Sequence, residues 1–132
     1  MWGRFQQSEL RIEISATEKR LRDSILRVEQ LQKWFFPLNI IEKKEGKEEL
    51  SSGDKFTFKI GLLEVENCVE TINSNCIRII LSGAIDGYQE WCWGDGWIQS
   101  RLEGVSLLPL SLAQTFNLLR LKSWVERENP HN

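Results

Sequence analysis

The sequence has few of the side chains that bind metals. Its 132 residues include a single histidine, His131, which lies next to the C-terminus, where chains commonly fray. The three cysteines, Cys68, Cys76 and Cys92, form no Cys-x-x-Cys pair. Neither a zinc site nor a Cys–His nucleophile is indicated, and we predict a protein without metal or cofactor. Because three cysteines also spell out no disulfide framework, we expect three reduced thiols in a cytoplasmic protein.

The sequence also lacks long apolar runs and an excess of either charge. The uncharged stretch over residues 105–119 is interrupted by Pro109, Gln114 and Asn117, so it is too short and too polar to cross a membrane. No apolar segment follows Arg4, so we expect no signal peptide. Seventeen Lys and Arg against 19 Asp and Glu give a net charge of −2, which argues against nucleic-acid binding through bulk charge. The glycine-rich phosphate loops and the nucleophile motifs are absent as well.

What the sequence does contain is repeated alternation of apolar and polar residues, typical of strands. Leu10, Ile12 and Ile14 alternate with charged residues and predict a first strand over residues 8–14. Similar patterns, separated by turn residues, predict further strands at 38–42, 55–60, 63–72, 76–81, 88–93 and 97–108.

Three helices are predicted from capping residues and apolar spacing. Ser15 and Glu18 fit a capping box that begins the first helix, and we expect a break or kink near residues 24–27 before a second short helix that Pro37 ends. Ser111 and Gln114 fit another box, which begins a final helix running to about residue 128. The apolar stripe of that helix is predicted to include Leu112, Phe116, Leu119 and Trp124, with Leu118, Leu121 and Val125 widening it.

These elements define an α+β fold. Strands joined by short turns form an antiparallel sheet, and the final helix is the one element long enough to cover its buried face. We therefore predict a helix-grip: a curved antiparallel sheet of about six or seven strands wrapped around a long C-terminal helix, with two short helices after the first strand. Residues 1–132 are expected to form a single domain with an ordered core at 8–128.

Four segments of the chain resemble the SRPBCC superfamily, the START-like group that includes polyketide cyclases and lipid-transfer domains. They are IEISA (12–16), LQKWFFP (31–37), GDKF (53–56) and LRLK (119–122). The resemblance is to uncharacterised bacterial members and covers about residues 8–128. It implies a cavity between the sheet and the last helix that holds an apolar small molecule or a lipid.

Aromatic residues are the candidates for lining such a cavity. The predicted ligand-binding residues are Phe56, Phe58, Trp91, Trp93, Phe116 and Trp34. Two interpretations stay open, because the same side chains could instead fill a closed core. Trp34, Phe35 and Phe36 in particular could either plug the core or line the mouth of a pocket.

The candidates for catalysis are Tyr88 and Glu90, which share one face of their strand. Trp91 and Trp93 occupy the opposite face, and burial of two indoles outweighs burial of one carboxylate, so we expect Glu90 at the surface. The sequence thus favours a binding domain for an apolar or aromatic molecule. The alternatives are a cyclase- or dehydratase-like enzyme using Glu90 and Tyr88, and a protein-interaction domain that an exposed apolar patch would mark. The sequence does not indicate an oligomeric state.

Overall fold

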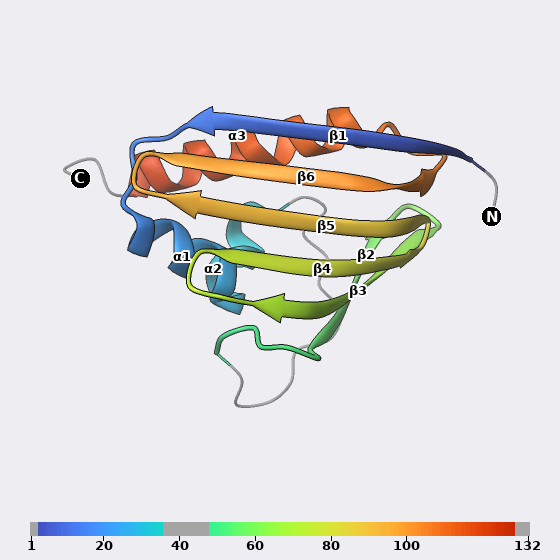
Figure 1. Ribbon diagram of the computed structural model, residues 1–132, viewed down its shortest axis with the longest axis horizontal. Helices are drawn as coiled ribbons and strands as arrows, with labels where there is room; N and C mark the ends of the chain where they lie inside the picture. Colours follow the sequence, from blue (N-terminus) through green and yellow to red (C-terminus); the bar gives the residue numbers. More distant parts are fainter. Residues whose placement is uncertain (1–2, 36–47, 129–132) are drawn as a thin grey trace.

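The computed structural model describes residues 3–35 and 48–128. The elements follow the predicted order of a strand, two short helices, five strands and a long helix (Figure 1). Their bounds are β1 Arg4–Glu13, α1 Glu18–Leu26, α2 Val28–Trp34, β2 Lys55–Ile60, β3 Leu63–Ile72, β4 Cys76–Gly83, β5 Ile85–Gly94, β6 Trp97–Ser106 and α3 Leu110–Glu128. The strand predicted at 38–42 lies outside the described residues.

The strands form one antiparallel sheet in the order β1-β6-β5-β4-β3-β2. β2 to β6 follow one another as a meander, and β1 joins the far edge beside β6, with Arg4 opposite Ser106 and Glu13 opposite Trp97. Short turns join the meander, as at Gly96, whose φ of 81° suits glycine. The predicted helix-grip fold is confirmed, with six strands.

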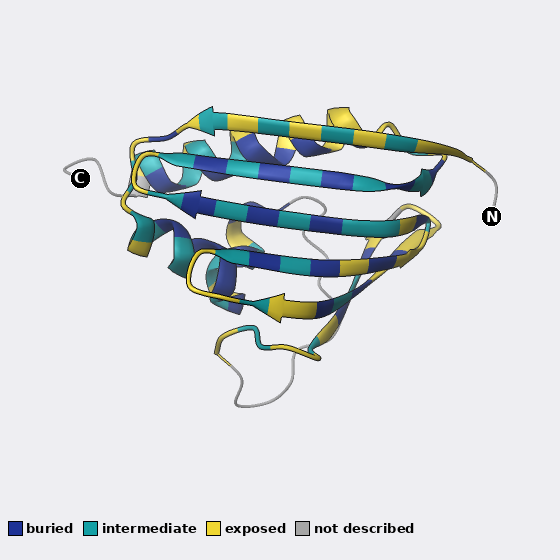
Figure 2. Ribbon diagram, viewed as in Figure 1, coloured by how far each residue is buried: buried dark blue, intermediate teal, exposed yellow. Residues whose placement is uncertain are grey.

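All three helices cover the same face of the sheet (Figure 1). α3 packs along β1 and β6, while α1 lies over β5 and contacts both α2 and α3. Figure 2 shows buried and less buried residues alternating along the central strands, as expected for a sheet with one covered face. The core therefore lies between the sheet and a layer of three helices, rather than beneath the last helix alone. Within the described part of the chain, no helix is long and apolar enough to cross a membrane.

Both predicted capping boxes are wrong in detail. α1 is capped by Thr17, whose Oγ1 accepts a hydrogen bond from the Arg20 backbone N–H at 3.1 Å. The backbone N–H of Ser15 instead donates to Glu126 on α3. α3 begins at Leu110, and the side chain of Gln114 bonds across to the sheet instead of returning to the helix terminus. The predicted break between the first two helices is confirmed at Arg27, which has extended backbone angles.

The predicted inward face of α3 is confirmed only in part. Leu112, Phe116 and Leu119 are exposed, with Phe116 at 45% and Leu119 at 55% of their surface. The buried stripe keeps the predicted Leu118, Leu121 and Val125 and is completed by Leu110, Gln114 and Asn117. Both faces of this helix carry apolar residues. The buried face also carries two amides, Gln114 and Asn117, so the sequence pattern makes it look like the polar, solvent-facing side.

The expectation of three reduced thiols is contradicted at two of them. Cys76 on β4 lies directly opposite Cys92 on β5, with their Cα atoms 4.2 Å apart, and the two form a disulfide. Cys68 is free. The pairing depends on the register of the β4–β5 hairpin, which the spacing of cysteines in the sequence does not reveal.

Candidate ligand-binding cavity

A cluster of aromatic side chains lies between α2 and the sheet. Trp34 at the end of α2 packs against Trp91 of β5, with ring centroids 5.5 Å apart. Phe35 stacks on Phe58 of β2 at 4.4 Å, and Phe58 contacts Phe56 at 5.2 Å. All five side chains are buried. The cluster is therefore part of the core and also, as shown next, part of a cavity wall.

Hydrogen bonds fix the position of Trp34. Its indole Nε1 donates to the Ser24 carbonyl at 2.8 Å, which ties α2 to α1. Its own carbonyl accepts a hydrogen bond from Arg120 Nε of α3 at 2.6 Å. These bonds hold the three helices together around the aromatic cluster.

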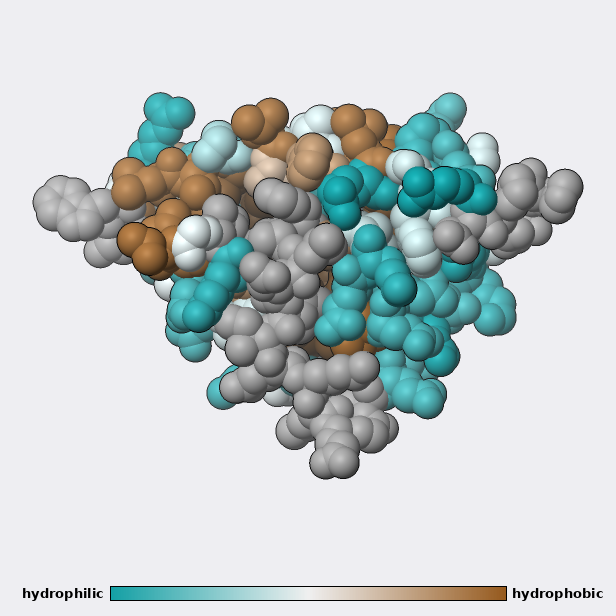
Figure 3. All heavy atoms as spheres, turned by 180° about the vertical axis from the view of Figure 1, so that it is seen from behind, coloured by the Kyte–Doolittle hydropathy of each residue, from teal (hydrophilic) through white to brown (hydrophobic). Residues whose placement is uncertain are grey.

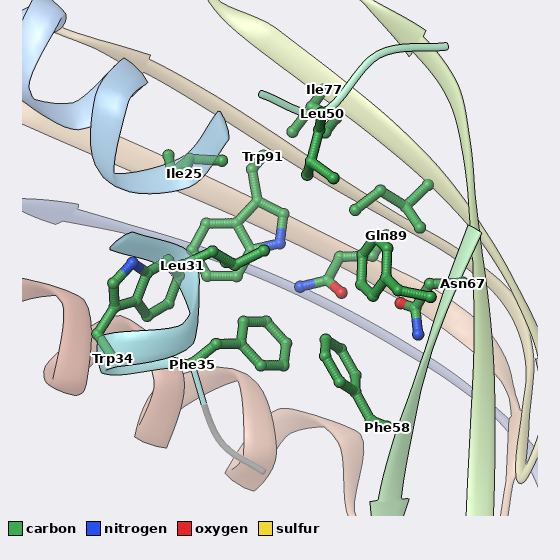
Figure 4. Close-up of a pocket in the computed structure, with 12 residues that line it drawn as sticks. Ile25, Leu31, Trp34, Phe35, Leu50, Phe58, Asn67, Ile77, Gln89 and Trp91 are labelled. Atoms are coloured by element: carbon green, nitrogen blue, oxygen red, sulfur yellow. The ribbon is translucent and has the colours of Figure 1, made fainter. Parts of the chain in front are cut away.

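Two small cavities adjoin the cluster. The α2 cavity, of about 20 Å³, lies between the first two helices and the sheet (Figure 4). It is lined by Ile25, Leu31, Trp34, Phe35, Leu50, Phe56, Phe58, Asn67, Ile77, Ile79, Gln89 and Trp91. The α3 cavity, of about 60 Å³, lies between the sheet and the last helix and is lined by Phe35, Phe58, Val65, Asn67, Leu81, Ile85, Gln89, Leu102, Leu108, Leu110, Ala113, Gln114 and Asn117. Phe35, Phe58, Asn67 and Gln89 line both, so these four side chains separate the two spaces.

Besides the indole N–H groups of Trp34 and Trp91, the polar side-chain groups in these walls are four amides, and none of the lining side chains is charged. Gln114 has its amide fully engaged: its Oε1 accepts from Ser8 Oγ at 2.6 Å, and its Nε2 donates to the carbonyl and hydroxyl of Ser100. Asn67 donates to the Val65 carbonyl at 3.1 Å. An apolar lining with a few polar groups is the wall composition of small-molecule sites, although both cavities are much smaller than such sites usually are.

The structure brings together four of the predicted ligand-binding residues. Phe56, Phe58, Trp91 and Trp34 line the α2 cavity, and Phe58 lines the α3 cavity as well. Trp93 is fully buried but lines neither cavity. Phe116, on the exposed face of α3, also lines neither of these two cavities, so its role in ligand binding stays a prediction.

Tyr88 and Glu90 lie on the opposite face of the sheet from the cavities. Tyr88 donates a hydrogen bond to Glu103 of β6, and the guanidinium of Arg78 lies over its ring at 3.9 Å. The hydrogen bond to Glu103, more than burial, raises the pKa of Tyr88. Glu90 lies opposite Arg78 of β4 and Arg101 of β6 in the strand register. The prediction that Trp91 and Trp93 point inward is confirmed, and both catalytic candidates are therefore separated from the cavities by the sheet.

Sequence reasoning missed the amides. Gln89 shares the inward face of β5 with Trp91 and Trp93, and the same alternation that places the tryptophans inward would have placed it there. Asn67 follows Val65 in the same way on β3. Both were missed because a polar residue on a strand is usually taken as solvent-facing.

The fold and this cavity define an α+β helix-grip protein with a small apolar interior site. No protein-family model and no curated protein matches the sequence. Among solved structures, protein CV1439 from Chromobacterium violaceum is similar at a TM-score of 0.70 and 17% identity, over 91% of this chain and 96% of that one. The Aha1 dimer from Colwellia psychrerythraea gives a TM-score of 0.67 at 14% identity, over 92% and 96%. Mll3558 from Rhizobium loti gives 0.71 at 8% identity, over 96% and 99%.

These structural neighbours share the fold that the sequence resemblance led us to expect. At such low identity they establish the shared fold and nothing about the ligand.

Proposed function

We propose that this protein binds a compact, mainly apolar small molecule between the sheet and α3, and does not transform it. The observation that carries the proposal is the α3 cavity, which combines apolar walls with buried amides. The helix-grip fold supports the same location, because the family that the sequence resembles uses this space. The two catalytic candidates, Tyr88 and Glu90, lie on the other side of the sheet, which supports binding over catalysis.

The size of the cavity sets a condition on binding. A space of about 60 Å³ holds a few waters, whereas an apolar cavity of about 150 Å³ is needed for benzene. A ligand must therefore displace side chains. Phe35 and Phe58 stand between the two cavities, so rotation of this pair would join them into one larger space.

The proposal is tested by a titration that reports on the cavity wall. Protein labelled at isoleucine and leucine methyl groups is titrated with benzene, acetophenone and 1-octanol, and methyl shifts are followed by NMR. We expect saturable shifts at Ile79, Leu81 and Leu102, which line the two cavities. Native mass spectrometry of the purified protein would detect a copurified molecule in parallel.

A matched pair of variants on β4 provides the control. Leu81→Phe places a ring into the α3 cavity and should weaken binding, while Ile80→Phe adds a similar ring on the outer face and should not. Ala113→Leu fills the same space from α3 and serves if Leu81→Phe does not fold. Equal affinities in all variants, or no saturable shift with any compound, would contradict the proposal.

The alternative function, protein interaction, also has one observation in its favour. Leu107, Leu112, Phe116 and Leu119 expose apolar surface, and Figure 3 shows apolar side chains gathered on the face where α3 lies. The described residues identify no occupant for this patch, so we build no function on it. Interaction becomes the better explanation only if the titrations detect no binding.

A further inference from the structure

Gln89 is a polar side chain in the centre of an apolar wall. It lies in the middle of β5, opposite Ile79 of β4 and Leu102 of β6, and only 8% of its surface is exposed. Its amide forms no hydrogen bond with any described residue. Figure 4 shows this amide pointing into the space near Trp91 and the two rings of Phe35 and Phe58. Since buried amides are almost always paired, this one has the capacity to bind something in the cavity.

Asn67, in the same wall, also has a hydrogen-bonding atom that is not used. Its Nδ2 donates to the Val65 carbonyl, but its Oδ1 accepts no hydrogen bond from the described residues. Asn67 and Gln89 are also the two polar residues that line both cavities. A molecule that joined the two spaces would therefore meet both amides.

Gln114 shows what a purely structural amide looks like in this protein. Its oxygen and nitrogen are both bonded, to Ser8 of β1 and to Ser100 of β6, and so it links α3 to the sheet. Gln89 makes no such link. Both glutamines line the α3 cavity, but only Gln114 has its amide engaged in hydrogen bonds. We therefore assign a packing role to Gln114 and a binding role to Gln89.

We propose that Gln89, together with the oxygen of Asn67, is the polar anchor for an uncharged hydrogen-bonding group at the end of an apolar ligand. This inference rests on the proposed function and specifies its ligand class: a ketone, ester, amide or alcohol. A primary amide can both donate and accept, so it can pair with any of these groups. A carboxylate or an ammonium group is disfavoured, because no charged side chain lines either cavity to compensate for its lost hydration.

The test uses three probes of nearly equal shape. Acetophenone carries a carbonyl where α-methylstyrene carries a methylene, and benzoate carries a negative charge. Dissociation constants are measured from methyl shifts of the wild type. We expect acetophenone to bind roughly tenfold more tightly than α-methylstyrene, the size of one net hydrogen bond, and benzoate not to bind at the same concentrations.

Gln89→Leu should remove this preference. It keeps the volume of the side chain but not its hydrogen-bonding atoms, so acetophenone and α-methylstyrene should bind with similar affinity. Gln99→Leu is the matched control, since Gln99 lies on β6 with its side chain away from both cavities, and it should retain the wild-type preference. Gln89→Met replaces the first variant if that does not fold.

The outcomes distinguish this inference from the proposed function. If the ketone and the alkene bind the wild type equally, or if Gln89→Leu keeps the preference, Gln89 is not the anchor although the cavity still binds. If none of the three probes binds, the proposed function itself is wrong.

Discussion

Single buried side chains decide how the two layers of this protein fit together, and Gln114 is the clearest case. Its amide bonds Ser8 and Ser100, so it joins α3 to two strands through one side chain. Gln114→Ala would leave both serines without these partners and open a cavity. We expect a loss of at least about 2 kcal/mol in the free energy of unfolding, measured by urea denaturation.

Gln99→Ala is the control for that variant. Gln99 is half-buried on the outer face of β6, away from the three helices. Its truncation should change stability by less than about 0.5 kcal/mol. Similar losses for the two variants would show that the Gln114 bonds do not hold the helix on the sheet.

Tyr88 allows a test of pH dependence at a single group, because the chain contains one tyrosine. Its hydrogen bond to Glu103 raises its pKa above the ordinary value of 10.0. The folded protein thus holds this proton more tightly than the unfolded chain does. The resulting stabilisation is fully present below pH 10 and is lost as the pH rises through the pKa of the folded state.

Ultraviolet absorbance of tyrosinate measures this titration directly. Glu103→Gln removes the negative charge, and the pKa of Tyr88 should then fall toward its ordinary value. Glu90→Gln, on the same face, should leave the midpoint unchanged. An unshifted midpoint in the wild type would rule out the Tyr88–Glu103 bond in solution.

At the scale of the element, α3 shows why the sequence could identify its buried face only in part. Apolar residues lie on both sides of this helix, with Leu118 and Leu121 inward and Leu112 and Leu119 outward. Periodicity finds a face only when the other side is polar. The strands were predicted more accurately, since alternation in β4 and β5 leaves a single choice of inward face.

The adjacent residues Leu118 and Leu119 test the orientation of α3. Leu118 is fully buried, whereas Leu119 is more than half exposed. We expect Leu118→Ala to cost about 2–5 kcal/mol of unfolding free energy, and Leu119→Ala less than about 1 kcal/mol. Thermal or urea denaturation measures both, and a larger loss at Leu119 would mean that the helix is rotated.

The β4–β5 hairpin makes a prediction about thiols. With Cys76 joined to Cys92, the denatured but unreduced protein should present one reactive thiol per chain, that of Cys68. Reduction should raise the number to three, as counted by alkylation and mass spectrometry. Cys92→Ser should give two thiols without reduction. Three thiols in unreduced wild type would restore the expectation drawn from the sequence.

At the scale of the whole molecule, the order of elements and the antiparallel sheet could be predicted, because both follow from local patterns. The cavity could be predicted only in part. Trp34 and Trp91 were found because large aromatic residues on inward faces must pack somewhere, but the roles of Gln89 and Gln114 depend on which partners the folded chain brings to them. The local sequence pattern predicts which face of a strand or helix a side chain lies on, whereas its hydrogen bonds depend on the partners that the tertiary structure brings to it.

The topology also predicts how the chain folds. β3, β4 and β5 pair through short hairpins. β1, in contrast, pairs with β6 near the other end of the chain, and Gln6 donates a hydrogen bond to the Ser106 carbonyl across 100 residues of sequence. Closing so long a loop is costly, so we expect the meander to form in the transition state and β1 to join afterwards. Ile77→Val in β4 should mainly slow folding, while Leu10→Ala in β1 should mainly speed unfolding.

Stopped-flow tryptophan fluorescence across a range of urea concentrations separates these two effects. Ile77 is buried, and Leu10 packs against the core, so both substitutions should destabilise enough for the rates to be compared. The ratio of the change in activation free energy to the change in stability should be high for Ile77→Val and close to zero for Leu10→Ala. The reverse pattern would mean that pairing of β1 with β6 precedes the meander, and that the link between the two ends of the chain nucleates folding.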